Sequence, residues 1–264
     1  MLEIKDSVAV ITGGGSGLGL ELARHWIQSG GKVVLADISS ESLEKIEAKI
    51  SGSKGDCLAV ICDVTRESDC SKLADAAIDK FGKINLVAPF AGIIMDGLMV
   101  SPDRKTGKVT RKMSLEDFQK VVDINLTGVF LTIRECSERM INNNCKGLVC
   151  LVSSTGSLGT AGQVNYSSTK AAMSVLPKVI TAEFFRRGLS NRIRCVAIAP
   201  GYCNTAMTGN MNQKVLDKIL SEIPIGRLIE PSEVSSLVTE LYRNEALSGE
   251  VFYIHGGLRL GSRG

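Results

Sequence analysis

The feature that most constrains the fold is an alternation of short apolar runs with longer amphipathic segments. Seven runs rich in Val, Ile and Leu are candidate strands: residues 7–11, 32–37, 57–64, 84–91, 147–154, 192–200 and 250–255. They lack strict apolar–polar alternation, which favours strands buried on both faces and therefore a parallel sheet. Because helices separate the strands, we predict an α/β fold: a doubly wound, seven-stranded parallel sheet with helices on both faces.

The chain has 264 residues, of which 44% are hydrophobic, enough for one large core. It shows no repeat, low-complexity segment or linker, so a single domain over residues 1–264 is the simplest interpretation. Two long connections, 93–114 and 202–226, follow the fourth and sixth candidate strands. Ligands of open α/β sheets bind at the carboxyl ends of the strands, so we expect both connections to be substrate loops.

Composition argues against several other classes of protein. The net charge is only +3 and aromatic residues make up 5% of the chain, so we expect no nucleic-acid partner. The eight cysteines form no CxxC pair and only two histidines are present, so we expect no metal. We interpret the cysteines as free thiols of a cytoplasmic protein. Neither a signal peptide nor an apolar run of roughly 18 residues is present, which predicts no membrane association.

A glycine-rich turn, Thr12 to Gly19, follows the first strand and precedes a predicted helix. Glycines allow a tight turn and let a pyrophosphate approach the backbone, while the helix N-terminus offers free N–H groups and a favourable dipole. A purely structural turn is the alternative. The position of the turn in the first strand–helix–strand unit favours a dinucleotide site, with expected contacts from Gly13, Gly15, Ser16, Gly17, Leu18 and Gly19.

Asp37, at the end of the second strand, predicts which dinucleotide binds. A carboxylate there can accept hydrogen bonds from the ribose hydroxyls of NAD and would repel the 2′-phosphate of NADP. Neither 38–40 nor 14–18 contains Arg or Lys, so we predict NAD as the cofactor. The alternative role for Asp37 is a helix cap, which Ser39 or Ser40 can already provide.

Three further residues suggest proton-transfer chemistry. Tyr166 and Lys170 share one face of a predicted helix, and Ser153 ends the fifth strand thirteen residues before Tyr166. Hydride transfer from an alcohol requires removal of the hydroxyl proton, and a phenol with a pKa of about 10 is a poor base at neutral pH. A nearby ammonium would stabilise the phenolate, and a serine can hold the substrate oxygen. A chance helical pair is the alternative, which the combination with Ser153 disfavours.

Together these motifs resemble the short-chain dehydrogenase/reductase family over nearly the whole chain, including Gly256-Gly257. The resemblance implies a Rossmann-type fold and a homotetramer. It also implies roles: Tyr166 as general acid/base, Lys170 on the nicotinamide ribose, Ser153 on the substrate oxygen and Asn125 in a proton relay to Lys170. Further cofactor contacts are expected from Asp63, Val64, Ala91, Gly92, Pro200, Gly201 and Thr205. A turn-forming Asp63 is the alternative at that position.

The sequence departs from the family in two places. Pro89-Phe90 replaces two side-chain amides that the family commonly carries before Ala91-Gly92, and His255 replaces a frequent aspartate. The first change puts the local support of the cofactor pocket in question. A narrower resemblance, to the type-10 17β-hydroxysteroid dehydrogenases that are also short-chain 3-hydroxyacyl-CoA dehydrogenases, covers 114–119, 125–128 and 244–260, with a shared insertion after strand four.

That insertion is basic: Asp103 is the single acid of residues 101–112, beside Arg104, Lys105, Lys108, Arg111 and Lys112. Such a loop can meet the phosphates of coenzyme A or an acidic carrier protein. A solvated hairpin turning at Gly107 is the alternative. Candidates for an apolar pocket are Ile94, Met95, Leu98, Tyr202, Met207 and Met211, although the last two could instead form one face of a lid helix.

We therefore predict an NAD(H)-dependent oxidoreductase that interconverts a secondary alcohol and a ketone, with 3-hydroxyacyl-CoA as one candidate small-molecule substrate. A 3-oxoacyl-[acyl-carrier-protein] reductase is the first alternative, and steroid, polyol or cyclic alcohol substrates stay open. The alternative of a different class is a non-catalytic, NAD-responsive binding protein on the same fold.

Overall fold

The computed structural model describes residues 1–50, 57–205, 208 and 212–258, and all seven predicted strands form in it. They pair side by side in one parallel sheet, in the order β3-β2-β1-β4-β7-β8-β9. The strands are β1 Val8–Thr12, β2 Lys32–Asp37, β3 Cys57–Ile61, β4 Leu86–Pro89, β7 Gly147–Val152, β8 Ile193–Pro200 and β9 Val251–Ile254. The predicted α/β fold is confirmed.

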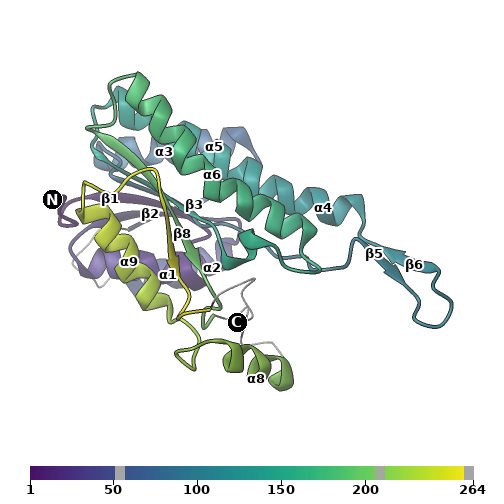
Figure 1. The fold of residues 1–264 in the computed structure, drawn as a ribbon. Coiled ribbons are helices and arrows are strands. Elements are labelled where there is room, and N and C mark those ends of the chain that lie inside the picture. Colours follow the sequence, from purple (N-terminus) through teal and green to yellow (C-terminus); the bar gives the residue numbers. More distant parts are fainter. Residues whose placement is uncertain (51–56, 206–207, 209–211, 259–264) are drawn as a thin grey trace.

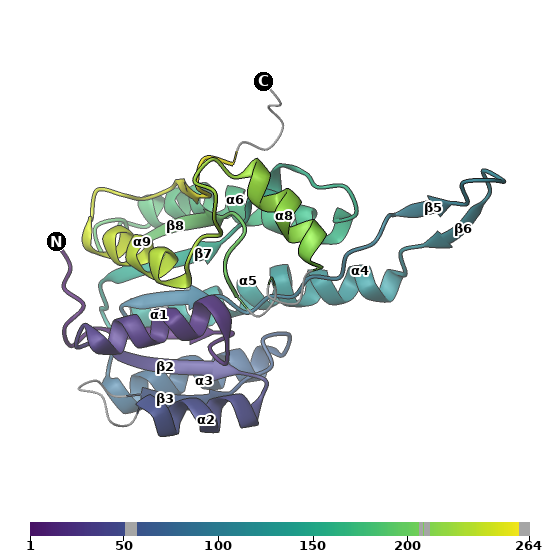
Figure 2. The ribbon, with the colours of Figure 1, turned by 90° about the horizontal axis from the view of Figure 1, so that it is seen from below.

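Helices cover both faces of the sheet (Figures 1 and 2). One face carries α1 Gly17–Gln28, α2 Ser40–Ile50 and α9 Pro231–Arg243. The other carries α3 Glu67–Phe81, α5 Gly128–Asn142 and α6 Val164–Arg186. Of two shorter helices, α4 Leu115–Val122 follows directly after the connection 93–114, and α8 Gln213–Glu222 lies within the connection 202–226. No helix in the part of the chain described by the structure is long and apolar enough to cross a membrane.

The side chains of the central strands alternate between two apolar cores. Ala9 and Ile11 of β1 face α1 and α9, where Trp26 and Tyr242 pack edge to face with ring centroids 4.8 Å apart. Val8 and Val10 face the opposite core under α3 and α5. Both faces of β1 are therefore dry, which explains why its sequence shows no polar alternation.

The strand order places the functional edge of the sheet. The chain builds outward from β1 through β2 to β3, then returns to the other side of β1 with β4. At this reversal the connections leave β1 and β4 in opposite directions, which opens a crevice at the carboxyl ends of the strands. Thr12, Asp37, Pro89, Val152 and Pro200 end their strands at this edge.

The basic insertion forms an arm that projects from the body of the molecule (Figure 2). Its antiparallel strands are β5 Val100–Pro102 and β6 Val109–Lys112. Gly107 adopts a positive φ of 69°, and Asp103 accepts hydrogen bonds from the backbone of Lys105 and Thr106, which closes the turn. We define residues 100–112 as the arm.

Candidate active site

The glycine-rich turn lies at the carboxyl end of β1, where it packs tightly against its neighbours. Gly13 has a φ of +64°, and a Cβ atom there would lie 2.7 Å from the backbone of Ala91. A Cβ at Gly19 would collide with the carbonyl oxygen of Gly13. Glycine is required at both positions, because a side chain would strike backbone atoms rather than a mobile group. The exposed Ser16 precedes Gly17, where α1 begins with its N–H groups at the crevice.

Asp37 lies directly against this turn. Its Oδ2 accepts a hydrogen bond of 2.9 Å from the Gly15 N–H, and its Oδ1 accepts one of 3.1 Å from the Ser39 N–H. Ser39 in turn accepts a bond from the Ser42 N–H at the start of α2. Ser39 thus provides the helix cap. The Asp37 carboxylate lies beside the glycine-rich turn, where the adenosine end of a dinucleotide is expected.

The third strand is shorter than predicted, since it ends at Ile61 rather than at Val64. Asp63 folds into a turn in which its Oδ1 accepts bonds of 3.0 and 2.7 Å from the backbone N–H and hydroxyl of Thr65. The turn-forming alternative therefore describes the Asp63 side chain in this structure. Val64 packs its side chain on α5, because a Cβ at Gly128 would lie 2.7 Å from Val64 Cγ2.

Lys170 lies on the second turn of α6 and is almost fully buried, at 6% exposure. Its Nζ donates a hydrogen bond of 2.9 Å to the Val152 carbonyl oxygen at the end of β7, and lies 5.6 Å from the centre of the Tyr166 ring. Burial disfavours the ammonium and lowers the pKa of Lys170 to about 8. The predicted pairing of the two side chains on one helix face is present.

Tyr166 occupies the first turn of α6, where the environment favours its neutral form. Burial raises the pKa of Tyr166 above its ordinary value, the hydrogen bond with Ser154 lowers it, and the charges of Asp96 and Cys203 raise it. The lowering of this pKa that we expected from Lys170 is not among these effects.

Ser153 does not face Tyr166. Its hydroxyl is buried and donates to the Lys170 carbonyl oxygen at 2.8 Å, with the Ser174 hydroxyl at 2.7 Å. The side chain therefore anchors the end of β7 to the middle of α6. This placement differs from the substrate-facing position expected from the thirteen-residue spacing.

Ser154, which the spacing did not identify, takes the position beside Tyr166. Its hydroxyl forms a hydrogen bond with the tyrosine and accepts one of 3.0 Å from the Gly156 N–H. A Cβ at Gly156 would lie 3.3 Å from the Tyr166 ring and 3.4 Å from Ser154 Oγ, so the three residues form one tight cluster. Adjacent residues of an extended chain point to opposite sides, which separates the two serines.

Asn125 is fully buried in a single π-helical turn, Asp123–Thr127, between α4 and α5. Its amide makes two hydrogen bonds with the backbone of Ile93: Oδ1 accepts from the N–H at 2.8 Å and Nδ2 donates to the carbonyl at 2.9 Å. A Cβ at Gly92 would lie 3.3 Å from Asn125 Oδ1 and 3.9 Å from Lys170 Nζ. Asn125 and Lys170 therefore both lie beside Gly92.

The Pro89-Phe90 departure is accommodated by the core. Pro89 pairs with Thr12 as the last residue of β4, and Phe90 packs against the core under α1. The hydroxyl of Thr12 accepts a hydrogen bond of 3.2 Å from the Ala91 N–H. Thr12 therefore supports the start of this loop without the two side-chain amides.

The connection after β8 crosses the start of α1. The Gly201 N–H donates to the Ile254 carbonyl oxygen at 2.9 Å, and a Cβ at Gly201 would lie 3.0 Å from His255 Cβ. The end of β8 is therefore packed closely against the end of β9. Further on, a Cβ at Gly17 would lie 3.9 Å from the Thr205 methyl group. Thr205 thus faces the glycine-rich turn. Met207 and Met211 lie outside the described residues.

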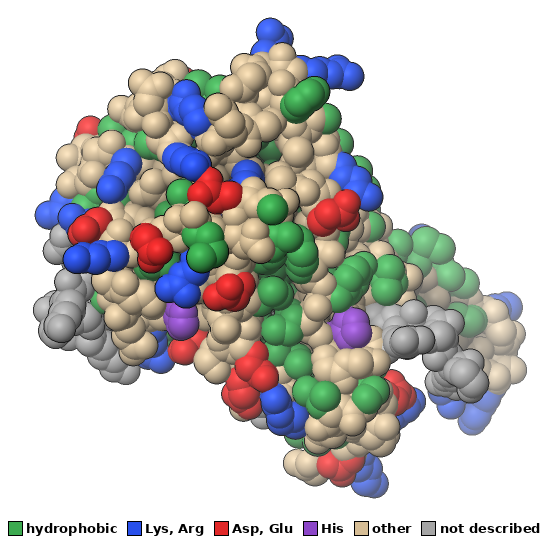
Figure 3. Space-filling view, turned by 60° about the vertical axis from the view of Figure 1, so that its left-hand side comes forward, with side chains coloured by type: hydrophobic (Ala, Val, Ile, Leu, Met, Phe, Trp, Pro, Cys, Tyr) green, Lys and Arg blue, Asp and Glu red, His purple; other side chains and the backbone are tan. Residues whose placement is uncertain are grey.

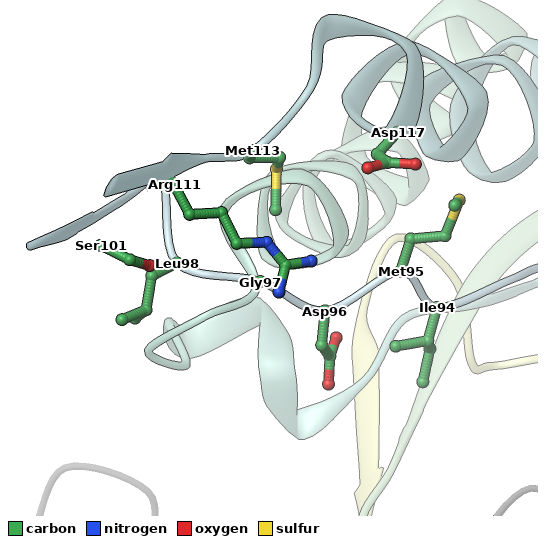
Figure 4. Close-up of a pocket in the computed structure, with 9 residues that line it drawn as sticks. All are labelled: Ile94, Met95, Asp96, Gly97, Leu98, Ser101, Arg111, Met113 and Asp117. Atoms are coloured by element: carbon green, nitrogen blue, oxygen red, sulfur yellow. The ribbon is translucent and has the colours of Figure 1, made fainter. Parts of the chain in front are cut away.

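A cavity of about 350 Å³ lies between the root of the arm and the loop that follows β4 (Figure 4). Three residues that we expected in an apolar pocket, Ile94, Met95 and Leu98, are in its wall, whereas Tyr202 is not. The wall also carries charge that the sequence did not assign to a pocket. Its other residues are Asp96, Gly97, Ser101, Arg111, Met113 and Asp117.

Comparisons with known proteins agree with this geometry. The short chain dehydrogenase family matches residues 7–216. The 3-hydroxyacyl-CoA dehydrogenase type-2 of Drosophila melanogaster is 36% identical over 97% of this chain and 99% of its own length. A 3-oxoacyl-[acyl-carrier-protein] reductase of Synechocystis is 32% identical over 98% of this chain and 99% of its own.

The fold is also similar to that of a solved enzyme. A 7α-hydroxysteroid dehydrogenase, in complex with NADH and 7-oxo glycochenodeoxycholic acid, superimposes with a TM-score of 0.85 at 26% identity. The match covers 98% of this chain and 97% of that enzyme. With the sheet order, the glycine-rich turn and the Tyr166–Lys170 pair in place, the chain belongs to the short-chain dehydrogenase/reductase family of oxidoreductases.

Proposed function

We propose that this oxidoreductase uses NAD(H) to interconvert a secondary alcohol and a ketone, with a 3-hydroxyacyl-CoA as the leading substrate candidate. The reaction class is supported by a cluster of four residues at the carboxyl ends of β4 and β7: Tyr166, Lys170, Ser154 and Asn125. A phenol, an ammonium and a hydroxyl held together there can exchange a proton with a substrate oxygen.

Members of the family bind a nicotinamide dinucleotide, and the residues of this chain fit one. The Gly13 and Gly19 contacts leave the turn without side chains, so a pyrophosphate can approach its backbone and the N-terminus of α1. The Asp37 carboxylate, in contact with Gly15, supports NAD over NADP, because a 2′-phosphate beside it would be repelled. The Thr205 methyl group lies near Gly17 at the other end of the turn.

The bound dinucleotide supplies or accepts the hydride, and the residues of the chain handle the proton. In the reductive direction Tyr166 donates its phenolic proton to the carbonyl oxygen, which Ser154 orients through its hydroxyl. Tyr166 then recovers a proton by way of Lys170, whose lowered pKa suits it to proton exchange near neutral pH. Asn125 holds the Ile93 backbone beside Lys170 and so shapes the entry to this path.

The choice of substrate rests on resemblance and on the arm. The relative from Drosophila melanogaster is named for 3-hydroxyacyl-CoA and the one from Synechocystis for 3-oxoacyl groups on a carrier protein. Ser101 and Arg111 of the basic arm line the cavity, so the positive charges of the arm could bind the anionic part of an extended substrate. We further propose that residues 1–264 form one domain and that the enzyme works in the cytoplasm as a homotetramer.

A substrate screen combined with one substitution tests the proposal. NADH oxidation is followed with acetoacetyl-CoA, small ketones and steroid ketones, and we expect turnover with acetoacetyl-CoA. Tyr166→Phe should lower kcat by about 100-fold or more while NADH still binds, because general acid–base steps contribute about 10²–10⁴-fold. Near-native turnover by this variant would refute the role of Tyr166. NADH binding without turnover of any ketone would instead favour the non-catalytic alternative.

A further inference from the structure

The loop after β4 is fastened to the start of α6 by contacts that the chemistry above does not use. The Gly97 N–H donates to the Gly162 carbonyl oxygen at 2.7 Å, and Gly97 pairs with Gln163 as an isolated parallel bridge. The Gln163 amide donates to both carboxylate oxygens of Asp96, at 3.0 and 3.1 Å. Asp96 and Gly97 line the cavity beside the arm (Figure 4), so one wall of this cavity is attached to the residues that lead into Tyr166.

Asn165 extends this connection to the backbone of Tyr166. Its side chain is fully buried, and both ends of its amide form hydrogen bonds. Nδ2 donates to the Met95 carbonyl oxygen at 2.9 Å, and Oδ1 accepts from the Tyr166 N–H at 2.7 Å. Met95 is another residue of the cavity wall. One side chain therefore joins this wall to the residue that we assign as the acid.

The position of Tyr166 in its helix explains why its N–H needs such a partner. The first N–H groups of an α-helix have no carbonyl partner within the helix. α6 begins at Val164, and Gln163 at its N-cap turns its side chain to Asp96 instead of to the helix. Asn165 thus satisfies a donor that the helix leaves open, and it anchors the turn that carries the tyrosine.

The next turn of α6 is anchored separately. Lys170 Nζ donates to the Val152 carbonyl oxygen at 2.9 Å, and the Ser153 hydroxyl donates to the Lys170 carbonyl oxygen at 2.8 Å. These bonds hold Lys170 to the end of β7 without help from Asn165. A substitution of Asn165 should therefore displace Tyr166 and leave Lys170 in place.

We propose that Asn165 is a positioning residue that holds Tyr166 in a fixed place relative to the substrate cavity. The inference rests on the proposed role of Tyr166 in proton transfer. A substrate that binds against the wall around Met95 is placed relative to the phenol through Asn165, because the amide is bonded to both the wall and the tyrosine. Proton transfer depends on this alignment, since a misplacement of about 1 Å can lower a rate about 100-fold.

Steady-state kinetics of Asn165→Ala test the proposal with the ketone that the substrate screen identifies. We expect kcat to fall about tenfold or more, because the turn that carries Tyr166 loses its link to the cavity wall. KM should be almost unchanged, since the side chains of the wall remain. NADH should bind as in the native protein, because the two amide bonds of Asn165 go to Met95 and Tyr166 rather than to the glycine-rich turn.

Asn165→Asp separates positioning from a general loss of stability. A protonated carboxyl has the shape of the amide, so it can donate to the Met95 carbonyl and accept from the Tyr166 N–H, whereas the carboxylate cannot donate. We therefore expect kcat of this variant, relative to the native enzyme at the same pH, to rise as the pH is lowered from about 8 to about 6, because burial raises the pKa of a carboxyl. A ratio as low as that of Asn165→Ala at every pH would overturn the proposal.

Asn85→Ala is the matched control. Asn85 joins two backbone segments in the same way: Oδ1 accepts from the Val8 N–H at 3.0 Å and Nδ2 donates to the Lys146 carbonyl oxygen at 2.8 Å. These bonds lie at the amino ends of β1 and β7, at the edge of the sheet opposite the crevice. We expect this variant to keep a near-native kcat. An equal fall in both alanine variants, or a native kcat in Asn165→Ala, would refute the positioning role, whereas turnover by Tyr166→Phe would refute the proposed function instead.

Amide hydrogen exchange, followed by mass spectrometry, tests the anchor without a substrate. In Asn165→Ala the first turn of α6, with Tyr166, should exchange faster than in the native protein. The turn around Lys170 should keep its native rate, because Ser153 still holds it. Unchanged exchange at Tyr166 would show that Asn165 does not hold this turn.

Discussion

At the scale of single residues, two adjacent serines differ completely in what they can do. Ser153 turns its hydroxyl to the backbone of Lys170, whereas Ser154 reaches Tyr166. Counting residues back from the tyrosine selects Ser153, because a count cannot show where the strand ends or how short the following loop is. Here β7 ends at Val152 and a single 3₁₀ turn, Thr155–Leu158, follows. Tyr166 and Lys170 could be paired from the sequence because they lie four residues apart on one helix, whereas Asn125 was located only by the family resemblance.

The two serines give a paired prediction. Ser154→Ala should lower kcat by at least about tenfold, because it removes the hydroxyl that orients the substrate oxygen at Tyr166. Ser153→Ala should leave kcat within about twofold and instead lower stability by about 1 kcal/mol, the usual value of one buried hydrogen bond. Steady-state kinetics and urea unfolding of both variants check this. The reverse pattern would return the catalytic role to Ser153.

Asp37 carries the prediction on cofactor choice. We expect NADH to bind at least about tenfold more tightly than NADPH, because the carboxylate would repel a 2′-phosphate and bond the ribose hydroxyls. Asp37→Ala should reduce the preference for NADH over NADPH, because it weakens NADH binding and also removes the repulsion of the 2′-phosphate of NADPH. Fluorescence titration with both nucleotides measures the two dissociation constants. Equal affinities in the native protein would contradict the assignment of NAD.

At the scale of elements, the arm is where the sequence left the most open. The turn at Gly107 and the surplus of positive charge could be predicted, because each depends on local residue types. What the sequence could not show is that the hairpin stands clear of the body, with residues 104–112 exposed (Figure 2). On the face drawn in the space-filling view, Lys and Arg side chains lie scattered among acidic and apolar ones (Figure 3).

The arm leads to a prediction about substrate capture. Replacing Arg104, Lys105 and Lys108 by Ser should raise KM for acetoacetyl-CoA severalfold and leave kcat almost unchanged, because these charges lie far from the transferred hydride. A small uncharged ketone serves as the control substrate and should be unaffected. The native enzyme should also lose affinity for the acyl-CoA as salt rises, since exposed charges are screened over about 8 Å at physiological ionic strength. Unchanged KM and indifference to salt would leave the arm as a solvated hairpin.

At the scale of the whole molecule, the sheet was predictable because its strands are buried on both faces. In β8 every residue is buried, and from Cys195 to Pro200 the strand is a continuous apolar run, with Arg194 as its one charged residue. Strand ends were less accurate: the predicted third strand extends past Ile61 into a turn that the Asp63 side chain closes. The apolar character of a run does not reveal the point at which a polar side chain starts to bond its own backbone.

The homotetramer proposal requires an apolar surface that a second copy can cover, and the outer side of α5 and α6 has exposed apolar side chains. Both helices cover the same face of the sheet (Figure 1). Each carries apolar side chains that stay in solvent: Phe130 on α5 is 52% exposed, and Val175, Val179 and Phe185 on α6 are 58%, 44% and 76% exposed. Valines four residues apart lie on one side of a helix, so α6 presents an apolar stripe outward. We propose that this stripe packs against the same stripe of a second copy.

This surface gives the last prediction. Full burial of an exposed valine contributes about 1.5–3 kcal/mol, so burying the exposed half of each of these valines contributes about 1 kcal/mol, and a carboxylate in its place would be buried without a partner. We therefore expect Val175→Asp combined with Val179→Asp to dissociate the tetramer into smaller species while each subunit keeps its fold, because both side chains are exposed in the single chain. Sedimentation velocity measures the assembly and circular dichroism the fold. Val215→Asp on α8, where the valine is 51% exposed, is the matched control and should leave the mass unchanged. A native protein that sediments as a monomer, or a double variant that stays tetrameric, would show that α6 does not form the interface.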